Sequence, residues 1–77
     1  MIKNSKINKI LSIAGSDSSA GAGIQADIKT VQSLGGYCLT AVSMVTSQNT
    51  KEITDTFIIP TETVMSQIRT TLEDFNC

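Results

Sequence analysis

A glycine-rich junction, AGSDSSAGAG at residues 14–23, constrains the fold of this chain more than any other feature. It lies between the mostly apolar run KILSIA, residues 9–14, and an amphipathic segment, residues 24–34. Glycines let ligand atoms approach a backbone closely, and a loop that leads from a strand into a helix offers unpaired N–H groups. The nine loop residues, 15–23, also exceed the usual connection of about 2–6 residues. We therefore predict a binding site here, with a merely flexible connection as the alternative.

The rest of the chain alternates between segments typical of strands and segments typical of helices. Helical spacing of apolar residues, followed by Gly35 and Gly36 as a stop, predicts the first helix. Glu62 suits the first turn of a second amphipathic helix, because the positive end of the helix dipole lies there. The predicted elements are, in order, strand 9–14, helix 24–34, strand 37–46, strand 53–59 and a helix from Thr61 onward.

This order of elements predicts an α/β fold with a mainly parallel sheet. Such sheets need helices on both faces, and the two predicted helices cannot cover three strands. The second helix also leads into no further strand. We therefore expect residues 1–77 to form a single incomplete domain, the front portion of a larger one.

The charge balance argues against a nucleic-acid partner. Six Lys and Arg against seven Asp and Glu give a formal net charge of −1, without the basic cluster that nucleic-acid binding requires. No segment approaches the roughly 18 apolar residues of a membrane helix, so no membrane partner is expected. Lys3, Lys6 and Lys9 precede an apolar run that is too short for a signal peptide, and we interpret the first eight residues as a polar start.

The cysteine and histidine content argues against a disulfide framework and against a zinc site. The two cysteines, Cys38 and Cys77, are far apart in the sequence and histidine is absent, so neither a disulfide framework nor a zinc site is indicated. We expect reduced thiols in a cytoplasmic protein and no metal ligands in this chain.

Two phosphate-binding motifs compete for the glycine-rich junction. A P-loop needs G-x-x-x-x-G-K-[ST], but Ala20 stands where its second glycine should be and no lysine follows. The stretch GAGIQA, residues 21–26, matches the G-x-G-x-x-A form of a dinucleotide site. Its glycines begin six residues past Gly15, and the second strand ends without the acidic residue that would hold a ribose. Both interpretations are disfavoured.

Asp27 and Gln48 are the candidate binding residues outside the junction. Asp27 lies on the inward stripe of the first helix and must have a partner, because an unpaired buried carboxylate is very costly. That partner is either a group within the fold or an amino group of a ligand. Gln48 and Asn49 follow the second strand, on the same rim as the junction. An amide there either caps a turn or pairs with two adjacent edge atoms of a heterocycle.

Three stretches carry a family resemblance: IAGSDSSAGAGIQADIKT at residues 13–30, TSQNT at residues 46–50 and IIPTETVMSQI at residues 58–68. Together they resemble the N-terminal portion of the hydroxymethylpyrimidine/phosphomethylpyrimidine kinases of thiamine biosynthesis. The resemblance implies a ribokinase-like, three-layer α/β/α fold. It also implies that ATP, with Mg²⁺, phosphorylates 4-amino-5-hydroxymethyl-2-methylpyrimidine and its monophosphate.

The resemblance assigns roles to individual residues. Gln48 would pair with the pyrimidine ring and Asp27 would lie near its amino group, while Ala22, Thr46 and Gly15 would line or border the pocket. Gly21, Gly23 and Asp17 would belong to the loop. The partner would be a small pyrimidine, and the full-length family suggests a homodimer. A pyridoxal kinase of the same fold and a non-catalytic pyrimidine-binding or interaction module remain alternatives.

The chain departs from the family pattern in two ways. Ala20 replaces the first of two glycines, and its methyl group would narrow the loop if that backbone needs a positive φ angle. The family's second glycine-rich anion hole, catalytic residue and ATP pocket lie in later sequence. We therefore expect no catalytic residue in this chain, no cofactor bound by it alone, and no phosphate transfer.

Overall fold

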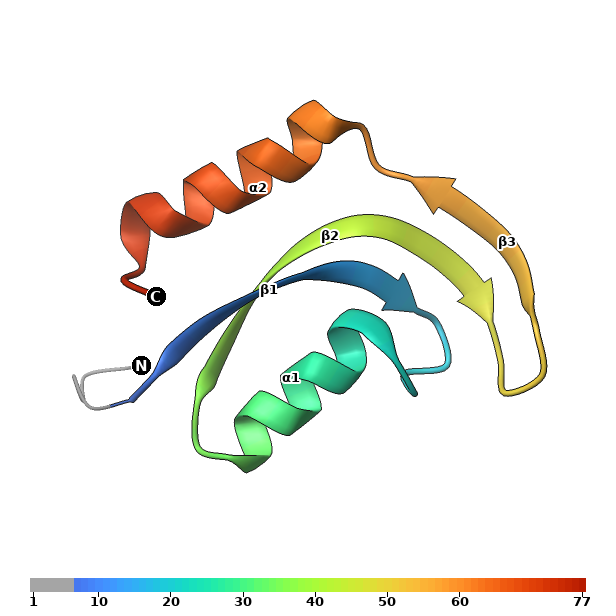
Figure 1. Cartoon of the computed structure of the whole chain (residues 1–77), viewed down its shortest axis with the longest axis horizontal. Coiled ribbons are helices and arrows are strands. Elements are labelled where there is room, and N and C mark those ends of the chain that lie inside the picture. The colour runs from blue at the N-terminus through green and yellow to red at the C-terminus, as the bar shows by residue number, and fades with distance from the viewer. Residues whose placement is uncertain (1–6) are drawn as a thin grey trace.

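The computed structural model describes residues 7–77 and contains three strands and two helices (Figure 1). In chain order these are β1 (Lys9–Asp17), α1 (Gly23–Ser33), β2 (Tyr37–Gln48), β3 (Ile53–Ile58) and α2 (Thr61–Asp74). Lys3 and Lys6 of the polar start lie outside the described residues. Within residues 7–77 no helix has the length and apolar character to cross a membrane.

The strands form one mixed sheet in the order β1-β2-β3. β1 pairs with β2 in parallel, from Lys9 opposite Tyr37 to Asp17 opposite Thr46. β3 returns antiparallel to β2 after a short turn, in which the Asn49 side-chain oxygen accepts the backbone N–H groups of Lys51 and Glu52. The prediction of an α/β fold is confirmed, and Asn49 caps a turn.

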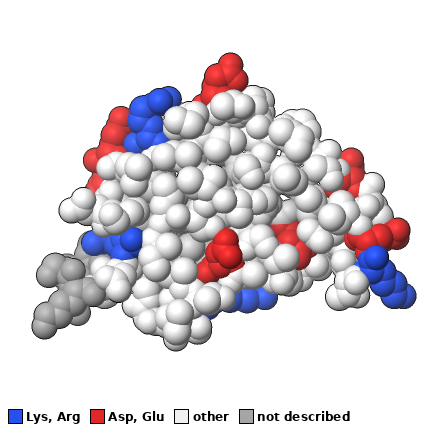
Figure 2. Space-filling view, viewed as in Figure 1, with Lys and Arg blue, Asp and Glu red and all other residues white. Residues whose placement is uncertain are grey.

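The two helices cover opposite faces of the sheet, which gives three layers (Figure 1). α1 packs against β1 and β2, and α2 packs against β2. Among the described residues only two hydrophobic side chains are buried, Ile24 on α1 and Ala41 on β2. Large apolar side chains such as Ile13 and Phe57 remain more than half exposed. Figure 2 shows acidic and basic side chains mostly around the edge of one face, some of them side by side, and a largely uncharged centre.

Two predicted boundaries at the glycine-rich junction and one at the end of β2 are wrong. β1 continues through Ser16 and Asp17, because these residues pair with Val45 and Thr46 after an irregularity in the register. Asp17 is therefore the last residue of β1 and Gly23 the first of α1, so the loop is only residues 18–22. Its length is ordinary, and the argument from an unusually long loop fails. β2 likewise extends to Gln48 instead of ending at residue 46.

Gln67 of α2 completes the hydrogen bonding of a strand edge. β3 pairs only with Met44 to Gln48 of β2. Beyond β3, the Val42 N–H donates to Gln67 Oε1 at 2.8 Å, and Gln67 Nε2 donates to the Val42 carbonyl at 2.9 Å. One side-chain amide thus supplies the donor and the acceptor that a neighbouring strand would supply, and it fastens α2 to the sheet.

We predict that Gln67→Ala lowers the free energy of unfolding of the 77-residue chain by about 1–3 kcal/mol, because two hydrogen bonds each contribute about 0.5–1.5 kcal/mol. Urea titration followed by circular dichroism measures the change. Gln32→Ala, at an exposed position of α1, is the matched control and should change stability by less than about 0.5 kcal/mol. Equal effects of the two substitutions would contradict the assignment.

Candidate functional site

The carboxylate of Asp17 holds the loop that joins β1 to α1. The side chain is only 3% exposed. Its Oδ1 accepts hydrogen bonds from the backbone N–H and the hydroxyl of Ser19, at 2.8 and 2.7 Å. Its Oδ2 accepts from the N–H groups of Gly21 and Ala22, at 3.0 and 2.8 Å. The Ala20 N–H donates to the Asp17 carbonyl at 2.9 Å, so one residue satisfies most of the loop backbone.

These bonds correct the expectation that the loop offers unpaired N–H groups to a ligand. The amides of Ser19, Gly21 and Ala22 already donate to an internal carboxylate, which also places a negative charge beside the N-terminus of α1. The Ser19 hydroxyl is the largest influence that lowers the pKa of Asp17, with the backbone donors adding to it and burial opposing it. The loop is therefore suited to shaping a pocket for an uncharged group, and unsuited to holding a phosphate.

Close contacts explain two of the glycines, Gly23 against the backbone and Gly15 against a side chain. Gly23 has φ +62°, and a Cβ there would lie 2.3 Å from the carbonyl oxygen of Gly15. A Cβ on Gly15 would lie 2.8 Å from Cγ of Met44. Gln25 of α1 fixes the contact between Gly23 and the end of β1. Its Oε1 accepts a hydrogen bond from the Asp17 N–H, and its Nε2 donates to the Ser16 hydroxyl. The start of α1 is thus held tightly against the end of β1.

Gln48 lies directly beside the loop, as the sequence predicted. The Ser18 hydroxyl donates to the Gln48 carbonyl at 2.9 Å, and the Gln48 N–H donates back to that hydroxyl at 2.8 Å. The side-chain Nε2 of Gln48 donates to Thr46 Oγ1 at 2.8 Å. Thr46 Oγ1 donates in turn to the Ser16 carbonyl at 2.8 Å. The ends of β1 and β2 are therefore joined by a continuous chain of hydrogen bonds.

These groups surround a pocket of about 240 Å³, large enough for a small heterocycle. It is lined by Gly15, Ser16, Asp17, Gly23, Met44, Thr46, Gln48 and Ile53. The structure thus brings together five of the residues expected from the sequence, Gly15, Asp17, Gly23, Thr46 and Gln48. Gly21 and Ala22 are exposed loop residues outside the lining.

Asp27 lies away from this pocket. Its Oδ2 accepts a 2.6 Å hydrogen bond from the Ser12 hydroxyl on β1, so the structure supplies the partner within the fold that sequence analysis held open. Burial raises the pKa of the neighbouring Cys38 thiol, and the charge of Asp27 adds to that effect. Its role toward a ligand amino group stays a prediction.

Sequence analysis missed the apolar walls of the pocket, Met44 and Ile53. Both were assigned to predicted strands, but which way a strand residue faces depends on the pairing register, and an irregularity interrupts the register of both β2 pairings. Gln25 and Ser18 were missed as well, although both belong to the stretch that carried the family resemblance.

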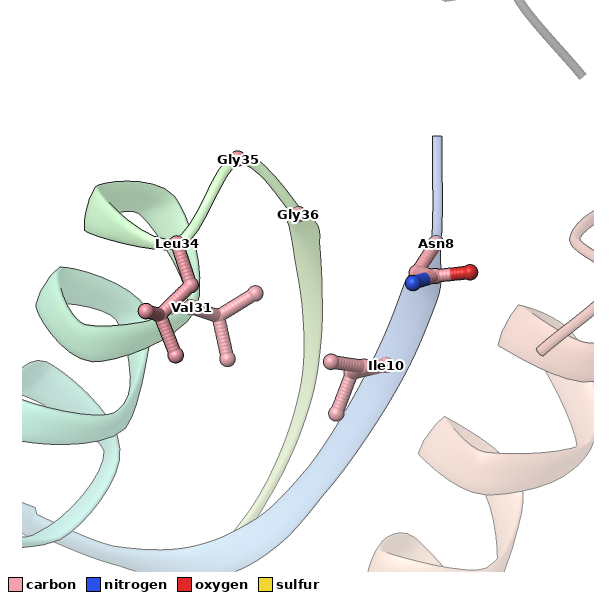
Figure 3. A pocket seen from close by; sticks show the side chains of 6 residues that line it. All are labelled: Asn8, Ile10, Val31, Leu34, Gly35 and Gly36. Carbon is pink, nitrogen blue, oxygen red and sulfur yellow. The ribbon is translucent and has the colours of Figure 1, made fainter. Parts of the chain in front are cut away.

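A second pocket lies at the opposite end of the strands, where Figure 3 shows α1 meeting β1. Its volume is about 350 Å³, and it is lined by Asn8, Ile10, Val31, Leu34, Gly35 and Gly36. Asn8 provides its only polar side chain, and none of the lining residues is titratable. The smaller pocket, with its network of polar side chains, is the better candidate for a functional site.

Fold and pocket together define an α/β protein with a candidate small-molecule pocket at the carboxyl ends of its parallel strands. A family model described as phosphomethylpyrimidine kinase matches residues 17–77. The chain therefore belongs to the phosphomethylpyrimidine kinase family, which confirms the resemblance seen in the sequence.

Comparison with individual relatives supports this family membership. The hydroxymethylpyrimidine/phosphomethylpyrimidine kinase of Haemophilus influenzae is 45% identical over 71 residues, which are 92% of this chain and 26% of that protein. The crystal structure of a phosphomethylpyrimidine kinase from Clostridium difficile superposes with a TM-score of 0.83 at 42% identity, over 87% of this chain and 31% of that one. An ADP complex of Bacillus subtilis pyridoxal kinase superposes with a TM-score of 0.81 at 38% identity, over 91% of this chain and 27% of that one. The chain thus spans about a quarter of the length of the H. influenzae relative.

We predict that Asp17→Asn destabilises the chain, because an amide nitrogen would face the N–H groups of Gly21 and Ala22. Since the Ser19 hydroxyl and the loop N–H groups lower the pKa of Asp17 in the folded chain, its carboxylate contributes fully above the pKa that Asp17 has in the unfolded chain. The contribution is lost as the pH falls through the lower, folded pKa. Urea midpoints measured from pH 2 to pH 7 should therefore converge for the two proteins only at the acid end. A constant difference across this range would contradict the role of the charge.

Ala20 adopts φ +67°, the positive angle that sequence analysis named as the condition for strain in the loop. A left-handed conformation costs a non-glycine residue about 1–2 kcal/mol, which a glycine at this position would avoid. The glycine would, however, have more conformational freedom in the unfolded chain, and this would cancel about 0.5–1 kcal/mol of the gain. We predict that Ala20→Gly raises the free energy of unfolding by up to about 1 kcal/mol. Ala26→Gly, inside α1, should lower it by about 1 kcal/mol in the same assay. A loss of stability in both variants would refute the strain.

Proposed function

We propose that this chain forms the pyrimidine-binding part of a hydroxymethylpyrimidine/phosphomethylpyrimidine kinase and is the N-terminal portion of its kinase domain. The observation that carries the proposal is the position of Gln48, which hydrogen-bonds to Ser18 of the glycine-rich loop and lines a pocket beside it. The family match over residues 17–77 supports the reaction class, the transfer of phosphate to a small molecule.

The pocket suits an aminopyrimidine in both shape and polarity. Met44 and Ile53 supply apolar surface for a flat ring, and Gly15 and Gly23 allow the ring to approach the backbone. Within residues 7–77 no hydrogen bond reaches Oε1 of Gln48, which leaves that oxygen to accept an N–H from the ring. The proposed task of these residues is to bind and orient the ring.

The described residues do not fit the nucleotide or the metal that the family resemblance implies. The loop N–H groups that would hold a phosphate are taken by Asp17. Residues 7–77 also contain no group of three or more His, Cys, Asp or Glu side chains able to hold a metal ion. The proposed role of residues 7–77 is therefore limited to binding the ring, with no catalytic residue among them.

The cellular setting belongs to the same proposal. Cys38 and Cys77 are free thiols, which suits a reducing compartment such as the cytoplasm. The exposed apolar side chains of β3, Phe57 and Ile58, provide surface for the proposed homodimer.

Pyridoxal is the second candidate substrate, because a solved pyridoxal kinase superposes on this chain almost as closely as the phosphomethylpyrimidine kinase does. Both substrates present a six-membered heteroaromatic ring with a hydroxymethyl group, so the apolar walls alone do not separate them.

We predict that the 77-residue chain binds 4-amino-5-hydroxymethyl-2-methylpyrimidine more tightly than pyridoxal, and that Gln48→Ala weakens pyrimidine binding about tenfold. Ligand-observed NMR titration measures both affinities. Gln32→Ala removes an exposed amide far from the pocket and should leave them unchanged. With ATP and Mg²⁺ present, no phosphorylated product should form. Tighter binding of pyridoxal would favour the second candidate, and undiminished binding by Gln48→Ala would overturn the proposed site.

A further inference from the structure

Thr46 joins Ser16 to Gln48 within the hydrogen-bond chain that crosses the candidate site. Its side chain is 7% exposed, and its hydroxyl oxygen lies 2.8 Å from the carbonyl oxygen of Ser16. The same oxygen lies 2.8 Å from Nε2 of Gln48. Because water has little access to Thr46, these two contacts account for its hydrogen bonding.

The proton between Thr46 and Ser16 has only one possible source. Two oxygens 2.8 Å apart need a proton between them, and a backbone carbonyl has none to give. The Thr46 hydroxyl therefore donates its single proton to the Ser16 carbonyl. Toward Gln48 it can present only a lone pair.

This polarity fixes the orientation of the Gln48 amide. A lone pair on Thr46 requires an N–H group opposite it, so the amide nitrogen faces Thr46 and Oε1 faces away. The reversed amide would bring two oxygens together without a proton. The carboxylate of Asp17, the other strong acceptor in the lining, is already occupied by its four loop donors. Oε1 of Gln48 accepts no hydrogen bond from residues 7–77 and is thus available as an acceptor for a ligand.

We propose that Thr46 is a positioning residue that determines ring specificity through Gln48. By holding the amide with its oxygen available, it favours a ring that carries an amino donor over a ring that carries an oxo acceptor at the same position. This inference rests on the proposed pyrimidine site and adds to it the reason why the amide discriminates.

The test compares two ligands, 4-amino-5-hydroxymethyl-2-methylpyrimidine and its 4-oxo counterpart, by NMR titration of the 77-residue chain. The ratio of their dissociation constants should favour the amino compound by tenfold or more. Thr46→Val has nearly the same shape but cannot orient the amide, and it should reduce that ratio at least fivefold. Thr46→Ser keeps the hydroxyl and should restore the ratio. Thr56→Val, at the position opposite Thr46 on β3, is the matched control and should leave the ratio unchanged.

A spectroscopic measurement tests the orientation without relying on the stability of Thr46→Val. In the ¹⁵N-labelled chain, one side-chain amide proton of Gln48 should show a nuclear Overhauser effect to Thr46 and slowed exchange with water. Amide protons directed away from Thr46 would overturn the proposal, as would a selectivity ratio that is the same in Thr46→Val. In either case Gln48→Ala would still weaken binding, and the proposed function would stand. If the unsubstituted chain binds neither pyrimidine, the proposed function and this inference both fail.

Discussion

The buried carboxylate of Asp17 is the interaction on which the rest of the site depends. It gathers four donors from Ser19, Gly21 and Ala22 around the last residue of β1 and so gives a loop of small residues one fixed shape. That shape places Ser18 where its hydroxyl meets the backbone of Gln48. Without the carboxylate, the loop donors would lose their partners and the loop would no longer hold Ser18 against the backbone of Gln48.

The same interaction decides which chemistry the loop can support. Glycine-rich turns at helix N-termini commonly bind phosphate, because their N–H groups point toward an anion. Here the anion is a side chain of the protein itself. The loop therefore forms one side of the pocket, and in the proposed site Gln48 and the apolar side chains of Met44 and Ile53 bind the ring. This division agrees with a chain that binds the ring of a substrate and does not hold its phosphates.

The sequence predicted the elements of the fold well and the details of the site only in part. Hydrophobic periodicity and helix stops are local signals, and they identified all five elements with errors of a few residues at their ends. A positive φ at Ala20 was named from the sequence only as a condition, because Ala20 replaces a glycine of the family pattern, and the structure shows that the condition is met. Pairing of Ser16 and Asp17 with β2, and the partner of Asp27, depend on contacts between distant segments. Amino-acid composition and the spacing of apolar residues do not predict such contacts.

The walls of the pocket differ in how firmly the described residues hold them. The wall built by β1, α1 and β2 contains the buried residues Asp17, Ile24, Ala41 and Thr46, and the hydrogen bonds of Gln25 tie it together. The opposite wall comes from Ile53, on a strand whose residues are all exposed and which pairs with β2 alone. Local opening costs least where few apolar contacts are buried, so β3 is the segment expected to open first. In the proposed site, Gln48 and Met44 therefore belong to the firm side of the pocket, and only the apolar contact made by Ile53 depends on the side that packing secures least.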